Sequence, residues 1–228
     1  MRPSLSSYHD DSRKRTSVAT RNTPQRDAVA TKARILDAAT SEFAHKGFDG
    51  ARVQSIAAKA KVNINLVYHY FQDKENLFVV VMEAAYSIVR SHHGDLELRN
   101  LPPDEAMRRL IIATFRMAIE FPEIIGLLTA ENMQLGRHVR GSSLISSLYD
   151  TLLDFIKDTL DRGSAGGMFR GDVDPTQLFI SINAEGYFYL SNRYTLGAIL
   201  RRDLDSKENL AERENFICDV IMGYLRPI

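Results

Sequence analysis

The side chains best suited to specific binding chemistry stand together in residues 63–77, NINLVYHYFQDKENL. Tyr68, His69, Tyr70 and Phe71 follow one another there, with asparagine amides before them and a lysine after them. Such groups donate and accept hydrogen bonds, and their rings add apolar contact area. The segment is too polar for a core. We therefore expect one side of it to pack and the other side to touch a partner.

Enzymatic chemistry has no comparable set of residues. The sequence contains no nucleophile elbow, no phosphate-binding loop and no paired-carboxylate site. The glycines between 163 and 171 follow no predicted strand, which argues against a dinucleotide site. His92 and His93 point about 100° apart on a helix, and no third ligand has matching spacing. We therefore expect no enzyme, no metal site and no cofactor.

Composition describes an ordinary folded protein of 228 residues, with 44% hydrophobic and 25% charged residues. No apolar run approaches the ~20 residues of a membrane helix, and the polar N-terminus lacks the apolar core of a secretory signal. The single cysteine, Cys218, excludes an internal disulfide. These features predict a cytoplasmic protein without a membrane partner.

Charge is distributed unevenly although the net charge is zero. Residues 1–23 are rich in Ser, Thr, Arg and Asp, with few large apolar residues, which predicts a flexible basic tail. A basic arm on a neutral body still attracts phosphate locally. Charge by itself does not decide between partners.

Helical periodicity runs through the rest of the chain, without alternating strand patterns or internal repeats. The sequence therefore predicts an all-α fold of about nine helices. We expect them at 24–47, 53–60, 64–71, 73–90, 102–121, from 122, at 143–162, from 174 and from 205.

Local signals fix several of these helix ends. Asn63, Asp73 and Asp174 are placed to accept an unpaired backbone N–H at the start of a helix. Gly47 is placed just past a C-terminus, where glycine is favoured. Asp205, with a glutamate three residues later, predicts a capping box at the start of the last helix.

The helices at 53–60 and 64–71, joined by three residues, form a helix-turn-helix. Ile56, Ala60, Val67 and Phe71 are expected to pack together, and Ala57 is small because the two helices cross there. The second helix is too short to be stable alone, so we expect the faces that do not pack to contact a partner.

The stretch ILDAATSEFAHKGFDGARVQSIAAKAKVNINLVYHYFQDKENL, residues 35–77, resembles the DNA-binding domain of the TetR family of bacterial regulators. The shared pattern comprises Ile35, Leu36, Ala38, Ala39, Phe43, Gly47, Phe48, Val53, Ile56, Ala57, Ala60, Val62, Tyr68, Tyr70, Phe71, Lys74, Glu75 and Leu77. The chain departs from the family at Lys61, where glycine is usual, and at Ala51 and Arg52, where threonine is common. It departs again at Asn65 and Leu66, where the family has small residues.

The resemblance implies a helix-turn-helix DNA-binding domain at 24–76, followed by a helical ligand-binding and dimerisation domain at 77–228. Such a regulator binds double-stranded operator DNA as a homodimer and is released by a small-molecule effector, here of unknown identity. Most of the family repress, although a ligand-dependent activator remains an alternative. A helical enzyme lacks a site here. An architectural DNA-binding protein would be more basic and would not need the long C-terminal body.

The resemblance also assigns roles to individual residues. Asn65 is expected to read a base edge, adenine being the favoured partner of asparagine, and Leu66 to touch a thymine methyl group. Phosphates are the expected partners of other side chains, which fix the register of the protein on DNA. The full candidate set is Arg52, Asn63, Asn65, Leu66, Tyr68, His69, Tyr70 and Lys74.

The C-terminal body carries two further expectations. The segment LFISINAEGYFYLSNRY, residues 178–194, is apolar nearly all round, as a helix buried on several sides should be. With Ile217, Val220, Ile221 and Tyr224 of the last helix, it predicts a homodimer interface, with burial inside a monomer as the alternative. Effector contacts are expected at Phe115, Asn183 and Tyr187, although aromatic residues at helical spacing also suit a plain core.

Overall fold

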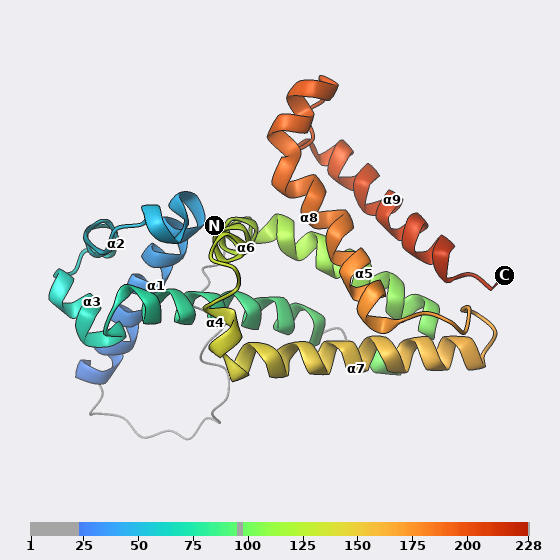
Figure 1. Ribbon diagram of the computed structural model, residues 1–228, viewed down its shortest axis with the longest axis horizontal. Helices are drawn as coiled ribbons and strands as arrows, with labels where there is room; N and C mark the ends of the chain where they lie inside the picture. Colours follow the sequence, from blue (N-terminus) through green and yellow to red (C-terminus); the bar gives the residue numbers. More distant parts are fainter. Residues whose placement is uncertain (1–22, 95–97, 228) are drawn as a thin grey trace. The chain divides into compact units, whose positions relative to one another are not determined.

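Nine α-helices and two short 3-10 helices make up the described part of the chain, residues 23–94 and 98–227 of a computed structural model (Figure 1). They are α1 (Thr23–Gly50), α2 (Val53–Ala60), α3 (Ile64–Phe71), α4 (Lys74–Gly94), η2 (Leu98–Asn100), α5 (Pro103–Glu120), α6 (Glu123–Met133), η3 (Val139–Gly141), α7 (Ser143–Ala165), α8 (Pro175–Leu200) and α9 (Lys207–Leu225). No strand occurs in these two ranges. The predicted all-α fold is confirmed. The predicted N-terminal tail lies outside the described residues.

Most of the predicted helix ends coincide with the observed caps. Asn63, Asp73 and Asp174 each accept a backbone N–H from the helix that follows, at 2.8, 2.8 and 2.7 Å. Gly47 adopts a φ of +69° and interrupts the helical geometry of α1. The expected cap at Asp205 is wrong, because Ser206 caps α9. The Asp205 carboxylate pairs instead with a guanidinium of α8, at 2.9 Å.

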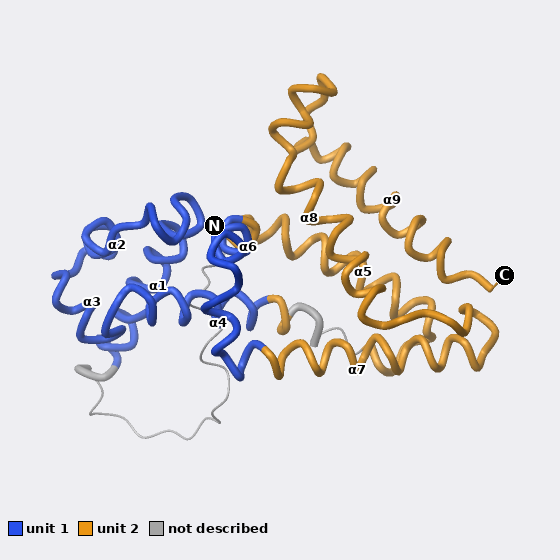
Figure 2. Tube along the Cα trace, viewed as in Figure 1, with its two compact units in different colours: residues 1–88, 126–145 blue, residues 89–125, 146–228 orange. Residues whose placement is uncertain are grey.

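The chain divides into two compact units (Figure 2). The first unit contains the described chain up to Ile88, together with Gly126–Ile145. Its core is aromatic: the ring centroid of Phe78 lies 4.8 Å from that of Phe43 and 5.2 Å from that of Phe48. α6 crosses α1 very closely there, since a Cβ on Gly126 would lie 2.3 Å from the carbonyl oxygen of Ala44.

The second unit contains Val89–Ile125 and Ser146–Ile228, with its described part built from α5, α7, α8 and α9. α5 lies against both α8 and α9, and α8 lies against α9 (Figure 1). Its buried apolar core includes Leu110, Phe115, Leu152, Ile156, Leu178, Ile182, Leu190, Ile217, Ile221 and Leu225. The guanidinium of Arg116 joins α5 to α9 through two bonds to Glu214, of 2.5 and 2.7 Å.

The compact units divide the chain differently from the expected boundary after residue 76. α4 belongs to the first unit as far as Ile88, and so does the segment 126–145. Sequence periodicity identifies each helix but carries no signal for which core its apolar face joins. The close crossing at Gly126 is a packing event between helices distant in sequence.

Candidate nucleic-acid interface

α1 provides the platform that holds the helix-turn-helix. Phe43 on α1 and Ile56 on α2 are 0% exposed, and Ala57 and Ala60 are buried beside them. Val67 and Phe71 bury the inner face of α3 at 2% and 4% exposure. The expected packing of these residues is confirmed. Only Val67 and Phe71 of the eight-residue helix are fully buried, which leaves its outer face for contact.

A residue in the left-handed conformation and backbone hydrogen bonds form the turn between α2 and α3. Lys61 takes a left-handed conformation, with φ +56° and ψ +48°, and its N–H bonds to the carbonyl of Ala58 at 3.2 Å. This is the position where the resemblance leads one to expect glycine, since a side chain is strained there. The Asn63 side chain then caps α3 by accepting the N–H of Asn65.

The candidate contact residues of α3 lie on its outer face. Asn65, Tyr68 and His69 are exposed, with 43% of Tyr68 accessible. Leu66 and Tyr70 are half-buried, and the Tyr70 ring lies edge-on to its two neighbours, His69 and Phe71. The helix therefore presents an amide, a phenol and an imidazole together, which is a hydrogen-bonding surface of the kind that reads base edges and grips phosphates.

Lys74 stands between the platform and this surface. Its ammonium lies 4.6 Å from the centroid of the Phe48 ring and donates to the carbonyl of Asp49 at 3.4 Å. An ammonium has three N–H donors, so these contacts leave room for a further acceptor. Lys74 thus also stabilises the end of α1, a role that the sequence pattern did not reveal.

A strained turn separates α3 from α4. Gln72 has φ +65° and ψ −61°, and the N–H of Asp73 bonds to the carbonyl of Phe71 at 2.7 Å. This three-residue turn with positive φ is rare and strained. It fixes the direction in which α4 leaves the recognition helix.

A buried ion pair ties α2 to α1. The Glu42 side chain is 0% exposed and accepts from Lys46 at 2.8 Å and Lys59 at 2.9 Å. Burial alone raises the pKa of a carboxyl, but hydrogen bonds from the two lysines outweigh burial and lower the pKa of Glu42 to about 2. Glu42 is therefore ionised at neutral pH.

Arg52, at the start of α2, is exposed and makes no side-chain cap.

The three residues expected to contact an effector lie on α5 and α8 of the second unit. Phe115 is 2% exposed, and its ring lies 3.2 Å from where a Cβ on Gly186 would stand. The Asn183 amide donates to the carbonyl of Phe179 in its own helix, at 2.9 Å. Tyr187 is half-buried against the same core. Phe115 belongs to the apolar core of this unit, and Tyr187 packs against it.

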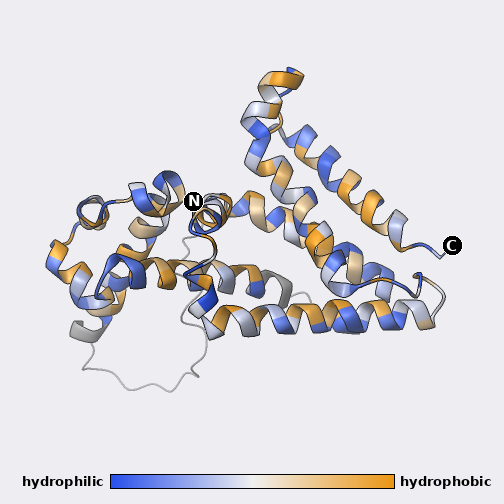
Figure 3. Cartoon of the chain, viewed as in Figure 1, coloured by the Kyte–Doolittle hydropathy of each residue, from blue (hydrophilic) through white to orange (hydrophobic). Residues whose placement is uncertain are grey.

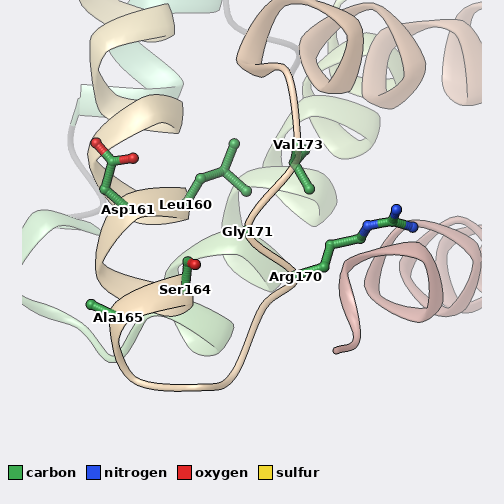
Figure 4. A pocket seen from close by; sticks show the side chains of 7 residues that line it. All are labelled: Leu160, Asp161, Ser164, Ala165, Arg170, Gly171 and Val173. Atoms are coloured by element: carbon green, nitrogen blue, oxygen red, sulfur yellow. The ribbon is translucent and has the colours of Figure 1, made fainter. Parts of the chain in front are cut away.

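Two surface pockets of the second unit lie elsewhere. One, of about 320 Å³, opens where α7 ends and is lined by Leu160, Asp161, Ser164, Ala165, Arg170, Gly171 and Val173 (Figure 4). Its charged groups already have partners, since Asp161 pairs with Lys157 and Arg170 with Asp172, both at 2.6 Å. The other, of about 240 Å³, is lined by Tyr189, Leu196, Leu200, Arg202, Leu204, Asn209, Glu212, Arg213 and Phe216. Neither is lined by any of the three expected residues.

Hydrophobic residues recur along α8 and α9 (Figure 3), and many of their large apolar side chains are exposed. Those at least 40% accessible are Ile180, Phe188, Tyr194, Ile199, Leu200, Phe216, Val220 and Tyr224. Ile217 and Ile221, which the sequence placed in a dimer interface, are 1% and 4% exposed within the unit's own core. That expectation is wrong for these two residues, because they occupy the face of α9 that packs against α5.

Residues 23–94 and 98–227 contain neither a candidate membrane-spanning helix nor a candidate group of metal ligands. No helix there combines the length and apolar character that a membrane span requires. No group of three or more His, Cys, Asp or Glu side chains is placed to hold a metal ion in those ranges. The side chains of His92 and His93 lie outside the described residues.

Family models match both parts of the chain. The model for bacterial regulatory proteins of the tetR family matches residues 35–81, and the model for a tetracyclin repressor-like C-terminal domain matches residues 103–221. The HTH-type transcriptional repressor NicS of Pseudomonas putida is 34% identical over 211 residues, which cover 92% of this chain and all of that protein.

Solved structures share the fold at lower identity. The TetR family transcriptional regulator PfmR of Thermus thermophilus superposes with a TM-score of 0.64 at 21% identity, covering 83% of this chain and 97% of that one. The transcriptional regulator FadR of Bacillus subtilis, in complex with stearoyl-CoA, superposes with a TM-score of 0.62 at 17% identity. The match covers 86% of this chain and 100% of that one.

Proposed function

Because this chain belongs to the TetR family of bacterial transcriptional regulators, we propose that it is a repressor that binds an inverted-repeat operator as a dimer and is released by a small molecule. The observation that carries the proposal is the outer face of α3, which exposes Asn65, Tyr68 and His69 while Val67 and Phe71 anchor it. Similarity to the repressor NicS over that protein's whole length supports repression. The protein would act in the cytoplasm, where chromosomal DNA lies.

Base reading is assigned to the first turn of α3, the part of a recognition helix that usually reaches base edges. Asn65 is the candidate for a bidentate contact to adenine, and Leu66 for contact with a thymine methyl group. Arg52, Asn63 and Tyr70 are the candidates at the edges of this surface.

Phosphate contact is assigned to Tyr68, His69 and Lys74. Their phenol, imidazole and ammonium groups donate to phosphate oxygens, which fixes register without reading sequence. Affinity should therefore fall with salt for every DNA sequence alike.

Dimerisation is assigned to the exposed apolar face of α8 and α9 described above. Phe216, Val220 and Tyr224 recur at spacing four on the outer side of α9 and are 57%, 41% and 51% exposed. Apolar side chains so close together on one face are typical of a protein interface. A homodimer through these helices brings two recognition helices to one operator.

The effector is proposed to bind among α5 and α8, near Phe115, Asn183 and Tyr187. These helices contribute an apolar core with the phenol of Tyr187 packed against it and the amide of Asn183 on the same helix, which suits a small and partly apolar molecule. A related fold that binds stearoyl-CoA in FadR supports this chemical class. Calorimetry with a candidate effector tests it, since an inducer must bind more weakly when operator DNA is present.

Selection of bound DNA from a random pool tests DNA recognition. Wild type should enrich one sequence family, and Asn65→Ala should relax preference at one base position by about 1–3 kcal/mol. Tyr68→Phe is the matched control, because loss of a phosphate contact weakens all sequences together. An unchanged preference in Asn65→Ala would remove Asn65 as a base reader.

A further inference from the structure

The segment between α6 and η3, residues 134–138, packs against the end of α1 and the first turn of α4. Figure 2 shows it in the same compact unit as the helix-turn-helix. The guanidinium of Arg137 lies 5.1 Å from the centroid of the Phe48 ring. It also donates to a carboxylate oxygen of Glu75 at 2.8 Å. A cationic side chain from a distant part of the sequence therefore stands beside the helix-turn-helix.

Lys74 and Arg137 share one aromatic ring. The Lys74 ammonium lies 4.6 Å from the centroid of the Phe48 ring, and the Arg137 guanidinium contacts the same ring. Two cationic groups held close together repel each other, and anions bound beside them relieve that repulsion. A DNA strand offers such anions at close and regular spacing. Because Lys74 is a candidate phosphate contact, the neighbouring guanidinium is placed to reach the same strand.

Arg137 has hydrogen-bonding capacity to spare. Its side chain is 50% exposed, and that of Glu75 is 53% exposed. A guanidinium has five N–H donors, and the bond to Glu75 occupies one of them. Exposed ion pairs contribute little to stability, so a phosphate can share the guanidinium with Glu75 or displace that carboxylate. The other oxygen of Glu75 lies 2.6 Å from Nε2 of His138, which leaves the carboxylate a polar neighbour.

Other carboxylates near this position are engaged by local donors. Asp49 accepts from the Gln134 amide at 2.8 Å, and Asp73 accepts the backbone N–H of Asn76 at 2.8 Å as the cap of α4. The N–H groups in the first turn of α4 add the partial positive charge of a helix start. These groups offset part of the negative charge that would otherwise repel DNA here.

The backbone that carries Arg137 is fixed by a tight turn. Leu135 and Gly136 adopt φ values of +58° and +70°. Such a conformation is strained for leucine and persists only where surrounding contacts hold it. Here the carboxylate of Glu131 accepts the backbone N–H of His138 at 2.8 Å. Arg137 therefore projects from a held position, which reduces the entropy that it loses on binding an anion.

We propose that Arg137 binds a backbone phosphate of operator DNA next to the phosphate bound by Lys74. The DNA-binding surface then includes residues 134–138 as well as α3 and the first turn of α4. The contact adds affinity and fixes register without reading sequence. In a dimer it occurs twice on each operator. The inference rests on the proposed operator binding.

Operator affinity across a salt series measures this contact. Each neutralised phosphate steepens the fall of log affinity with log salt by about 0.9, so Arg137→Gln should reduce that slope by about 2 for the two chains of a dimer. Affinity should fall about 10-fold at about 50 mM salt, and the difference from wild type should close towards about 200 mM. The sequence selected from a random DNA pool should stay the same. Arg137→Lys keeps the charge and should keep the slope.

Arg140→Gln is the matched control. It removes the same charge from an exposed arginine of η3, whose guanidinium donates to the carbonyl of Leu135 at 3.2 Å. Its salt slope should stay within about 0.5 of the wild-type slope. Thermal unfolding of both glutamine variants should match wild type, because both arginines are exposed.

Four results would overturn the inference while leaving operator binding intact. They are an unchanged salt slope in Arg137→Gln, an equal loss of slope in Arg140→Gln, a slope in Arg137→Lys as low as in Arg137→Gln, and a large drop in the melting temperature of Arg137→Gln. A wild-type protein that selects no DNA sequence would instead refute the proposed function, and this inference with it.

Discussion

The buried pair of Glu42 with Lys46 and Lys59 gives a stability prediction with a pH signature. The folded protein lowers the pKa of Glu42 from its usual 4.5 to about 2. At about 1.4 kcal/mol per pH unit, that difference amounts to about 3 kcal/mol of stability at neutral pH. Both lysines are about half exposed, and glutamine can still accept one hydrogen bond. We therefore expect Glu42→Gln to lower the free energy of unfolding by about 2 kcal/mol at pH 7.

The sign of the pH dependence follows from the lowered pKa. The stabilisation is complete above pH 4.5 and is lost as pH falls towards 2, because protonation removes the charge from Glu42. Urea unfolding at fixed protein concentration should show the difference between wild type and Glu42→Gln shrinking over that range.

A surface pair provides the control. Glu105→Gln breaks an exposed pair with Arg109 and should cost less than about 0.5 kcal/mol at any pH. A difference for Glu42→Gln that stays constant between pH 7 and pH 3, or that matches the surface control, would show that the ionised Glu42 does not stabilise the fold.

Three further substitutions test the α2–α3 turn, the dimer interface and the crossing of α6 with α1. Lys61→Gly relieves a left-handed backbone and should stabilise the protein by about 0.5–1 kcal/mol in thermal unfolding; a loss of stability would show that the turn is not strained. Val220→Glu should yield a folded monomer in sedimentation, whereas Ile221→Glu should unfold the chain because Ile221 is buried; a folded Val220→Glu dimer would remove α9 from the interface. Gly126→Ala drives a methyl group into the Ala44 carbonyl and should lower both stability and operator affinity, and an unchanged melting temperature would contradict the close crossing.

Local chemistry explains why much of the first unit is predictable from sequence. A capping asparagine at position 63 and an interrupting glycine at position 47 act within one or two residues of themselves, so the sequence displays their effect directly. The small Ala57 and the inward Phe71 follow from helical spacing in a short motif. These elements place the exposed face of α3 without any knowledge of distant contacts.

Contacts between distant segments explain the failures. The sequence places Ile217 and Ile221 on one apolar face of a helix, but it does not indicate whether that face packs in the core or against a partner. The packing of α9 against α5 shows that they belong to the core. Likewise, nothing near His138 in the sequence indicates that its Nε2 lies 2.6 Å from the carboxylate of Glu75, which is 63 residues away. A short Glu–x6–His spacing exists between Glu131 and His138, but charge pairs at such spacing are common on surfaces. The contacts of the segment after α6 therefore cannot be predicted from the sequence.

Operator binding as proposed places the two α3 helices of a dimer in successive major grooves. Footprinting on the selected operator, combined with sedimentation of the complex, tests it most directly. We expect two protein chains per operator and an inverted repeat whose half-sites lie one helical turn, ~34 Å, apart. A single unrepeated site occupied by one chain would contradict it.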